Sequence, residues 1–280
     1  MEKYYHLYTT ALKKCQLFRN DSDRIFFLNR LAIYRVEYNV VIYAYCLMDN
    51  HIHLLVSGEE ESILAFFRQL KTMYGWYLSK SETEVVNVDL TEFKANLRVI
   101  KGEEDFKTVV AYILRNPFAA GIDSPYSYNW SSAYLYFNPR VEYFRGIPLK
   151  TYGIRKAREI LKTRITLPDS YTVFDDMFSP VSWCNFRRVE RAFGKSSDFF
   201  RLVSKWNLEQ DEEAKIEAIE KNTYTDSALL SKITEYCRLQ GVDKVEDLTK
   251  AELRVLATTS HKRWGASKKQ IQRILAPDII

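Results

Sequence analysis

The segment Tyr45-Cys46-Leu47-Met48-Asp49-Asn50-His51-Ile52-His53-Leu54-Leu55-Val56 joins two apolar runs through a short polar stretch. Residues 40–48 are rich in β-branched and aromatic side chains, which favour an extended strand. Asp49-Asn50 is a turn signal, and residues 51–57 are a second candidate strand. The segment therefore predicts an antiparallel hairpin.

Elements on both sides of this hairpin extend the pattern. Tyr and Thr favour a strand over residues 4–10, and apolar residues at helical spacing predict a helix over 24–38, with capping side chains at 20–23. Further along, we expect a helix over 62–79, a loop over 82–89, a short strand over 97–101 and a helix over 104–115 that Pro117 stops. This order predicts an α+β fold with helices over an antiparallel sheet.

The chain changes character after about residue 150 and is expected to be all-α in its last third. The predicted elements there are helices over 150–165, 189–206, 211–221 and 227–239, with a turn at 167–170. No internal repeat or low-complexity tract interrupts them.

Composition sets broad limits on function. The four cysteines lie far apart and form no CxxC pair, which argues against a zinc cluster. No stretch reaches the roughly 18 apolar residues that crossing a bilayer takes, and Met1 is not followed by an apolar signal core. We therefore expect an unprocessed cytoplasmic protein. The net charge of +5 permits a nucleic-acid partner without requiring one.

Two of the four histidines, His51 and His53, are separated by one residue. Residues i and i+2 of a strand point to the same face, so two imidazoles side by side can take two positions around one metal ion. Ile52 and Leu54 would point into the core. The pair also fits two polar residues on an exposed strand face, and the pattern occurs in metal-dependent hydrolases, so the spacing leaves these alternatives open.

Tyr112 lies near the end of a predicted helix, four residues before Asn116. A tyrosine hydroxyl can attack a phosphodiester and remain as a covalent phosphotyrosine, and Asn116 offers an oxygen ligand on the same helical face. Because Asn116 precedes a proline, it is biased away from helix. Among 19 tyrosines most are structural, and Tyr74 and Tyr77 are rivals on composition alone.

Taken together, several segments resemble one family. Residues 45–56 closely resemble the histidine-hydrophobic-histidine (HUH) segment of the single-tyrosine transposases, which include the IS200-like and REP-associated tyrosine transposases. Further resemblances, in matching order over about residues 1–140, are Tyr5-His6-Leu7 to the first strand, residues 18–28 to the first helix, Tyr112-Ile113 with Asn116-Pro117 and Gly121 to the catalytic helix, and Trp130-Ser131-Ser132-Ala133-Tyr134 to a following tract.

The resemblance implies a ferredoxin-like fold and a metal-assisted transesterification on single-stranded or hairpin DNA. It implies that Tyr112 is the nucleophile and that His51, His53 and Asn116 hold Mg²⁺ or Mn²⁺, in a monomer or a homodimer. Two departures stand out. Asp49 occupies a position where the family commonly has proline, and Thr10-Ala11 replaces a common Arg-Gly, so a DNA contact there is lost or moved.

The C-terminal residues are similar to a helix-turn-helix. A helix is expected from Leu248 through Arg263, a turn at Gly265 and a second helix over 266–275. The residues expected to face duplex DNA are Lys268, Lys269, Gln270 and Arg273. A solvated basic helix is the alternative. The expected division is thus a single-tyrosine transposase domain over 1–145, a helical linker over 146–225 and this candidate DNA-binding domain over 226–280.

Three functions are in competition at this point. The first is a metal-dependent, single-stranded DNA endonuclease and strand transferase that forms a 5′-phosphotyrosine intermediate. The second is a DNA-binding regulator that has lost cleavage, although binding alone does not need two histidines and a tyrosine together. The third is a hydrolase of small phosphoesters, which would need more acidic ligands near the histidines.

Overall fold

The computed structural model divides the chain into two compact units. The first comprises Met1–Thr10, Gln16–Asn116 and Ser124–Lys205, and the second comprises Ala11–Cys15, Pro117–Asp123 and Trp206–Ile280. The structure describes residues 3–12, 16–80, 88–122, 124–153, 165–175, 177–204, 226–239, 242, 245, 248–264, 266, 271, 274 and 275.

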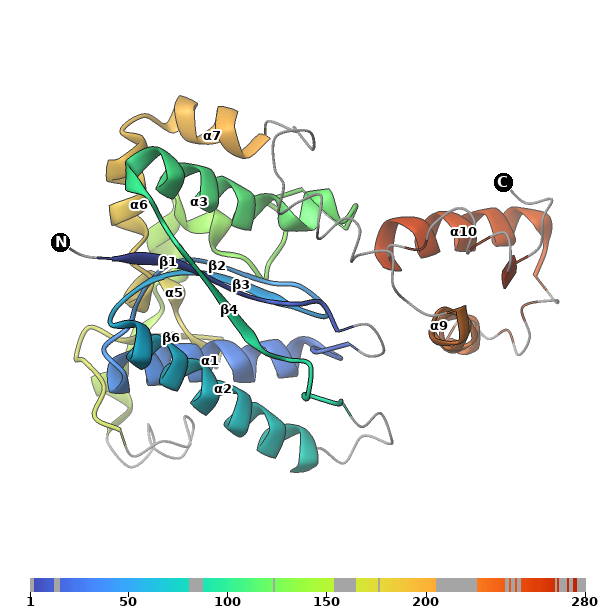
Figure 1. Cartoon of the computed structure of the whole chain (residues 1–280), viewed down its shortest axis with the longest axis horizontal. Helices are drawn as coiled ribbons and strands as arrows, with labels where there is room; N and C mark the ends of the chain where they lie inside the picture. The colour runs from blue at the N-terminus through green and yellow to red at the C-terminus, as the bar shows by residue number, and fades with distance from the viewer. Residues whose placement is uncertain are drawn as a thin grey trace. The chain divides into compact units, whose positions relative to one another are not determined.

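A four-stranded antiparallel sheet forms the centre of the first unit (Figure 1). Its strands are β1 (Tyr4–Thr9), β2 (Val41–Leu47), β3 (Ile52–Ser57) and β4 (Ala95–Val99), in the spatial order β2-β3-β1-β4. The expected hairpin is confirmed as β2 and β3, with Cys46 opposite His53. Since β3 lies between β2 and β1, its residues are buried along its whole length.

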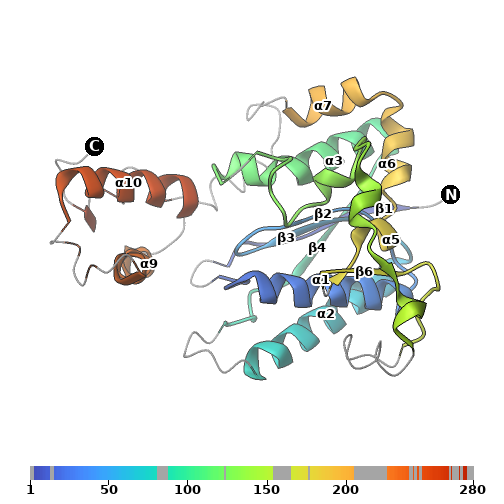
Figure 2. The same cartoon turned by 180° about the vertical axis from the view of Figure 1, so that it is seen from behind.

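Helices cover both faces of this sheet. Figures 1 and 2 show α1 (Asp21–Glu37) and α2 (Glu60–Lys80) on one face and α3 (Gly102–Ala119) on the other. The order β1-α1-β2-β3-α2-β4 on this sheet is the ferredoxin-like arrangement. The expected α+β fold is therefore confirmed. None of the described helices combines the length and apolarity needed to cross a membrane.

The start of α1 follows from capping chemistry. The Asn20 side chain accepts a hydrogen bond from the backbone N–H of Asp23, at 3.0 Å, which satisfies one of the amides that a helix start leaves open. Arg19 in turn donates from its side chain to the Asp23 carboxylate at 2.9 Å. The polar run before the apolar helix thus fixes where α1 begins.

The end of α3 differs from the expectation that Pro117 stops it. The helix continues to Ala119, with Pro117 inside its last turn. It ends where Gly121 takes a φ of 66°, which glycine adopts without strain. There Ile122 N–H donates to Pro117 O and Gly121 N–H to Phe118 O, the bonding pattern of a Schellman cap. A proline removes one backbone donor, which the last turn tolerates, so Asn116 stays helical.

The tract that follows α3 covers the outer edge of β2. Trp130 O accepts from the backbone N–H of Leu47 at 2.9 Å, and Ser131 forms an isolated antiparallel bridge with Cys46. The Ser132 hydroxyl accepts from Tyr45 N–H at 2.9 Å. This edge of the sheet is therefore occupied by residues from later in the same chain.

The first unit continues well past the expected boundary at residue 145. A small sheet has the order β5-β6-β7, and three helices follow it. Tyr171, just before β6, donates from its hydroxyl to Ala32 O of α1 at 2.8 Å. Residues 146–204 that the structure describes therefore pack onto the sheet domain rather than forming a linker. The described elements of the first unit after α3 are η1 (Ser132–Leu135), η2 (Val141–Phe144), β5 (Ile147–Pro148), η3 (Leu149–Tyr152), β6 (Thr172–Phe174), β7 (Met177–Phe178), α5 (Pro180–Trp183), α6 (Phe186–Phe193) and α7 (Ser196–Ser204).

The expectation of one continuous helix over residues 189–206 is wrong. Residues 189–206 do not form a continuous helix, because Gly194 takes a φ of 70° and ends α6, and α7 starts two residues later. The expected turn at 167–170 is confirmed by a hydrogen bond from Tyr171 N–H to Pro168 O. Most of the expected helix over 150–165, and the helix over 211–221, lie outside the described residues.

The second unit contains α9 (Asp226–Leu239) and α10 (Lys250–Trp264). Thr249 caps α10 reciprocally with Glu252: its hydroxyl accepts from Glu252 N–H, and the Glu252 carboxylate accepts from Thr249 N–H. An apolar cluster joins the two helices to the residues that follow. Its buried members are Leu229, Ile233, Cys237, Leu256, Ala257, Ala266, Ile271 and Leu275. The expected DNA contacts Lys268, Lys269, Gln270 and Arg273 lie outside the described residues.

Candidate active site

His53 lies in the central strand β3 and is fully buried. Its strand neighbours are Cys46 on β2 and Tyr8 on β1. Because side chains alternate along a strand, Ile52 and Leu54 point to the face covered by α1 and α2. The imidazole of His53 points to the other face, beneath α3.

His51 lies one residue before β3, in the turn of the hairpin. Its carbonyl accepts from Met48 N–H at 2.9 Å, and its Nδ1 lies 2.8 Å from Oδ1 of Asn50. The His51 and His53 ring centroids are 4.9 Å apart, with the planes at 87°. The two imidazoles thus lie side by side as the sequence predicts, although both are buried rather than on an exposed face.

The hairpin turn that carries His51 is anchored to α1 by Asp49. Arg24 donates from Nη2 to the Asp49 carboxylate, and the backbone carbonyl of Asp49 accepts from Leu17 and Phe18 N–H at 2.7 and 3.1 Å. The Arg24 guanidinium also lies over the Trp130 ring, 5.5 Å from its centroid. The residue that replaces the family's common proline therefore has its own structural role.

Tyr112 reaches the histidines from α3. Its ring centroid lies 5.4 Å from that of His53, at 90°, and 5.5 Å from that of His6, at 72°. Asn116, one turn further along, donates from Nδ2 to Tyr112 O at 3.1 Å. The structure therefore brings Tyr112 and both predicted histidines together, with Asn116 on the same helix.

The rival tyrosines lie on the other face of the sheet, on α2. Tyr74 is fully buried and donates to Leu17 O at 2.5 Å, and burial raises its pKa well above the ordinary value. Tyr77 stacks on Phe26 with centroids 4.0 Å apart. Burial, followed by the nearby Asp23 carboxylate, raises the pKa of Tyr77 to about 12. The aromatic rings that pack against Tyr74 and Tyr77 are phenylalanines and each other, on the face of the sheet away from the histidines.

His6 is the site residue to which the sequence reasoning gave no role. It lies on β1 and its Nε2 is 3.0 Å from Nδ1 of His53. Tyr8, two residues later on the same face, has its ring centroid 4.9 Å from that of His6. The strand alternation could have found both residues, since Tyr4, His6 and Tyr8 share one face of β1 and Tyr4 packs on Phe106 of α3.

The nitrogen and oxygen atoms of these side chains determine which metal ions the site suits. The side chains brought together are the imidazoles and the Tyr112 phenol, and Asn116 lies one helical turn after Tyr112 on α3. Within the described part of the chain, no three His, Cys, Asp or Glu side chains form a metal-ligand group. The histidine pair with an amide oxygen fits a partial site, in which water and substrate oxygens complete the coordination of a divalent ion.

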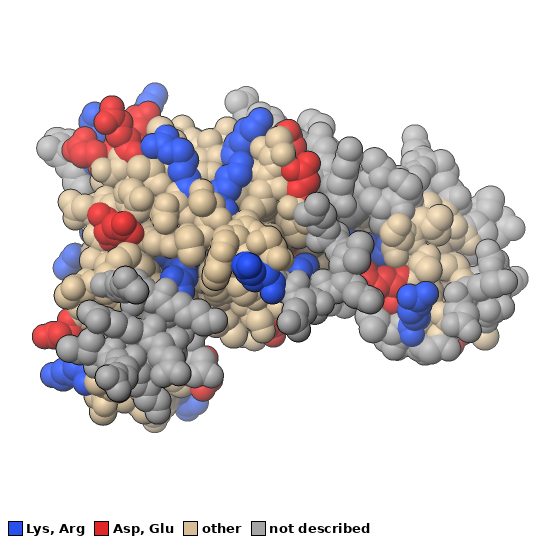
Figure 3. All heavy atoms as spheres, turned by 90° about the horizontal axis from the view of Figure 1, so that it is seen from below, with Lys and Arg blue, Asp and Glu red and all other residues tan. Residues whose placement is uncertain are grey.

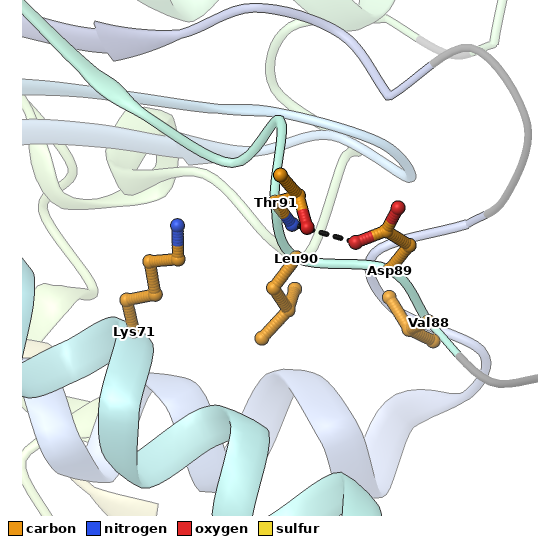
Figure 4. A pocket seen from close by; sticks show the side chains of 5 residues that line it. All are labelled: Lys71, Val88, Asp89, Leu90 and Thr91. Carbon is orange, nitrogen blue, oxygen red and sulfur yellow. Dashed lines mark hydrogen bonds between the residues drawn. The ribbon is translucent and has the colours of Figure 1, made fainter.

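One surface hollow lies beside α2, and none of the described histidines lines it. This hollow of about 580 Å³ lies between α2 and the segment before β4, lined by Lys71, Val88, Asp89, Leu90 and Thr91 (Figure 4). Asp89 there accepts from Thr91 N–H at 2.8 Å, so its carboxylate serves the local turn. On the face seen in Figure 3, Lys and Arg side chains are interspersed with acidic and uncharged residues.

Residues 1–116 match the family model described as "Transposase IS200 like". Residues 1–116 are therefore similar to the IS200-like transposases. The match includes His6, His51, His53 and Tyr112 and ends at Asn116, so the matched region carries every residue of the candidate site. Residues 117–280 lie outside it.

One solved structure is similar to part of this chain. A solved structure described as a REP-associated tyrosine transposase bound to a REP hairpin is similar at 13% identity, with a TM-score of 0.38, over 47% of this chain and 76% of that one. No curated protein matches the chain. The likeness to IS200-like transposases therefore depends on the sequence match over residues 1–116.

Proposed function

We propose that this chain is a single-tyrosine transposase that cuts and rejoins single-stranded DNA at Tyr112. The observation that carries the proposal is the approach of the Tyr112 ring to His53, with centroids 5.4 Å apart, within a region similar to the IS200-like transposases. A tyrosine beside metal-binding side chains is the arrangement that phosphodiester attack needs.

The proposed step is a transesterification. The Tyr112 hydroxyl oxygen attacks the scissile phosphorus and loses its proton, while the bond from phosphorus to the 3′ oxygen breaks and that oxygen takes up a proton. The products are a 5′-phosphotyrosine and a free 3′-hydroxyl. One phosphoester bond forms for each that breaks, so rejoining by a 3′-hydroxyl needs no nucleotide cofactor.

His51, His53 and the Asn116 amide oxygen would hold Mg²⁺ or Mn²⁺. When bound, such an ion polarises the phosphate and stabilises the charge that develops in the transition state. Imidazole suits later transition metals and oxygen donors suit Mg²⁺ and Mn²⁺, so phosphate oxygens of the DNA would contribute to retention of the ion. We expect the ion to bind more tightly with DNA than without it.

The C-terminal unit is proposed to bind duplex DNA beside the cleavage site. Its apolar cluster supports a folded helical module, and Lys268, Lys269, Gln270 and Arg273 are the sequence-based candidates for contacts in the major groove. Substituting these four residues together should weaken binding to hairpin DNA and leave cleavage of an unstructured strand less affected.

A labelled-oligonucleotide assay tests the central proposal. The full chain is incubated with a pool of hairpin-bearing single strands, with Mn²⁺ or with EDTA, and run on a denaturing gel. A 5′-phosphotyrosine predicts that a 3′-end label stays with the protein and a 5′-end label leaves on a fragment with a free 3′-hydroxyl. The adduct should need Mn²⁺ and be destroyed by protease.

Matched tyrosine variants identify the nucleophile. Tyr112→Phe should bind the oligonucleotides and form no adduct, whereas Tyr77→Phe, on the opposite face of the sheet, should form it normally. An adduct that persists in Tyr112→Phe would assign the nucleophile elsewhere. Binding without an adduct from any member of a fully randomised pool would favour a DNA-binding regulator.

A further inference from the structure

His6 and His53 form a hydrogen-bonded pair of imidazoles on neighbouring strands. Nε2 of His6 lies 3.0 Å from Nδ1 of His53, and the rings are nearly parallel, at 26°, with centroids 5.2 Å apart. Tyr8 of β1 is directly opposite His53 of β3. His6 lies two residues before Tyr8 on the same face of β1, so it is the diagonal neighbour of His53. Diagonal neighbours are within reach of long side chains.

Burial makes this contact specific. His6 is 1% exposed and His53 fully buried, and the Tyr112 ring lies edge-on to both. Bulk water therefore cannot replace the partner of His53 Nδ1. The bond also fixes the rotation of the His53 ring, and with it the direction in which Nε2 points.

We propose that His6 is a positioning residue: it accepts the Nδ1–H of His53 and thereby leaves Nε2 of His53 as the metal-binding nitrogen. A neutral imidazole carries one N–H and one lone pair, and a metal takes the lone pair. The metal-competent form of His53 must then be protonated at Nδ1, which faces His6. The inference rests on the proposed function, in which His53 is a ligand.

The neighbouring histidine has the same arrangement. His51 Nδ1 lies 2.8 Å from the amide oxygen of Asn50, which is an acceptor, so His51 also carries its proton on Nδ1 and offers Nε2. Both ligands are thus oriented through Nδ1 by an acceptor from outside the pair. Such outer partners set the tautomer and raise the basicity of the ligating nitrogen.

Nitrogen-15 NMR of the imidazoles tests the assignment without metal or DNA. The chain has four histidines, so single substitutions, including His261→Ala, assign every signal. We expect His53 and His51 as Nδ1–H tautomers, and we expect His6→Leu to change the His53 pattern while His261→Ala does not. An Nε2–H tautomer for His53 in the wild-type chain would overturn the proposal.

Binding of Mn²⁺ alone, followed by water-proton relaxation, tests the consequence. His6→Leu removes the acceptor and should weaken Mn²⁺ affinity by about 10- to 100-fold, whereas His6→Gln keeps an amide oxygen and should stay close to wild type. Equal affinity in wild type and His6→Leu, or equal loss in both variants, would overturn the positioning role.

The readouts separate this inference from the proposed function. If His6→Leu loses Mn²⁺ affinity but no oligonucleotide yields an adduct with the wild-type chain, His6 positions a metal ligand and the transposase chemistry fails. If adducts form and His6→Leu matches wild type in both NMR and Mn²⁺ binding, the chemistry stands and the role of His6 is refuted.

Discussion

Arg24 of α1 donates to the Asp49 carboxylate two residues before His51, and so joins the first helix to the turn of the β2–β3 hairpin. The Arg24 side chain is 10% exposed and that of Asp49 is 27% exposed, so removing one partner leaves a charge with little access to water.

Arg24→Ala should therefore destabilise the fold by about 1–3 kcal/mol, less than the loss of a fully buried pair because Asp49 is partly solvated. It should also loosen the turn and weaken Mn²⁺ binding. Urea unfolding and Mn²⁺ relaxation measure the two effects. Asp21→Ala is the matched control, since Asp21 lies 3.8 Å from Arg24 and is 75% exposed. Equal losses in both variants would contradict the anchoring role.

Asn116 allows a test of the third ligand position. Asn116→Ala removes the amide oxygen and should lower both Mn²⁺ affinity and adduct yield, while Asn116→Asp retains an oxygen and adds a negative charge that favours the cation. We expect adduct formation to follow the order Asp, Asn, Ala at limiting Mn²⁺. Titration of Mn²⁺ in the oligonucleotide assay measures it, and an alanine variant equal to wild type would mean that water takes this position.

Stability in acid should depend on Asp23. Burial pushes the Asp23 pKa up, but hydrogen bonds from Arg19 outweigh it and hold the pKa below its ordinary value of 3.8. A depressed folded-state pKa gives stability that is fully present above pH 3.8 and lost as pH falls through the folded value.

The measurement is urea unfolding of the wild type and Asp23→Asn from neutral pH down into acid. The stability gap between them should be constant above the ordinary carboxyl pKa and close progressively below it. Asp21→Asn, in the same helical turn, should show a smaller gap throughout. A gap that widened in acid would have the wrong sign for an ion-paired carboxylate.

Truncation tests whether residues 146–204 belong to the sheet domain. A chain ending at residue 145 keeps the tract that covers β2 but loses Tyr171 and Asn185, whose hydroxyl and N–H bond to Ala32 O and Ile42 O. We expect it to aggregate or melt at lower temperature, because apolar surface and strand edge become exposed. A chain ending at residue 205 should fold. Equal melting temperatures would show that the added residues do not stabilise the sheet.

The sequence predicted the sheet and its helices because the local signals there agree with one another. The turn at Asp49-Asn50 and the cap at Asn20 are short-range chemistry, and both lie where expected. The end of α3 was missed because Gly121, not Pro117, terminates it. The break at Gly194 was missed because the apolar spacing is helical on both sides of it.

The candidate site was predictable in part. His51 and His53 are separated by one residue, so local geometry relates them, whereas Tyr112 came from a resemblance and no local pattern separates it from Tyr74. His6 gained its importance from strand pairing across 47 residues. Packing of residues 146–204 onto α1 and β2 is likewise long-range, and local periodicity carries no information about it.

The placement of His53 in the middle strand has an evolutionary consequence. Ile52 and Leu54, its chain neighbours, are fully buried on the opposite face, so the same few residues build the hydrophobic core and orient the imidazole. A close-packed interior transmits small shifts, and a substitution that repacks the core under α1 would also displace the His53 imidazole on the opposite face. Selection for a stable protein and selection for an active one therefore act on a single strand, and neither property can drift freely while the other is maintained.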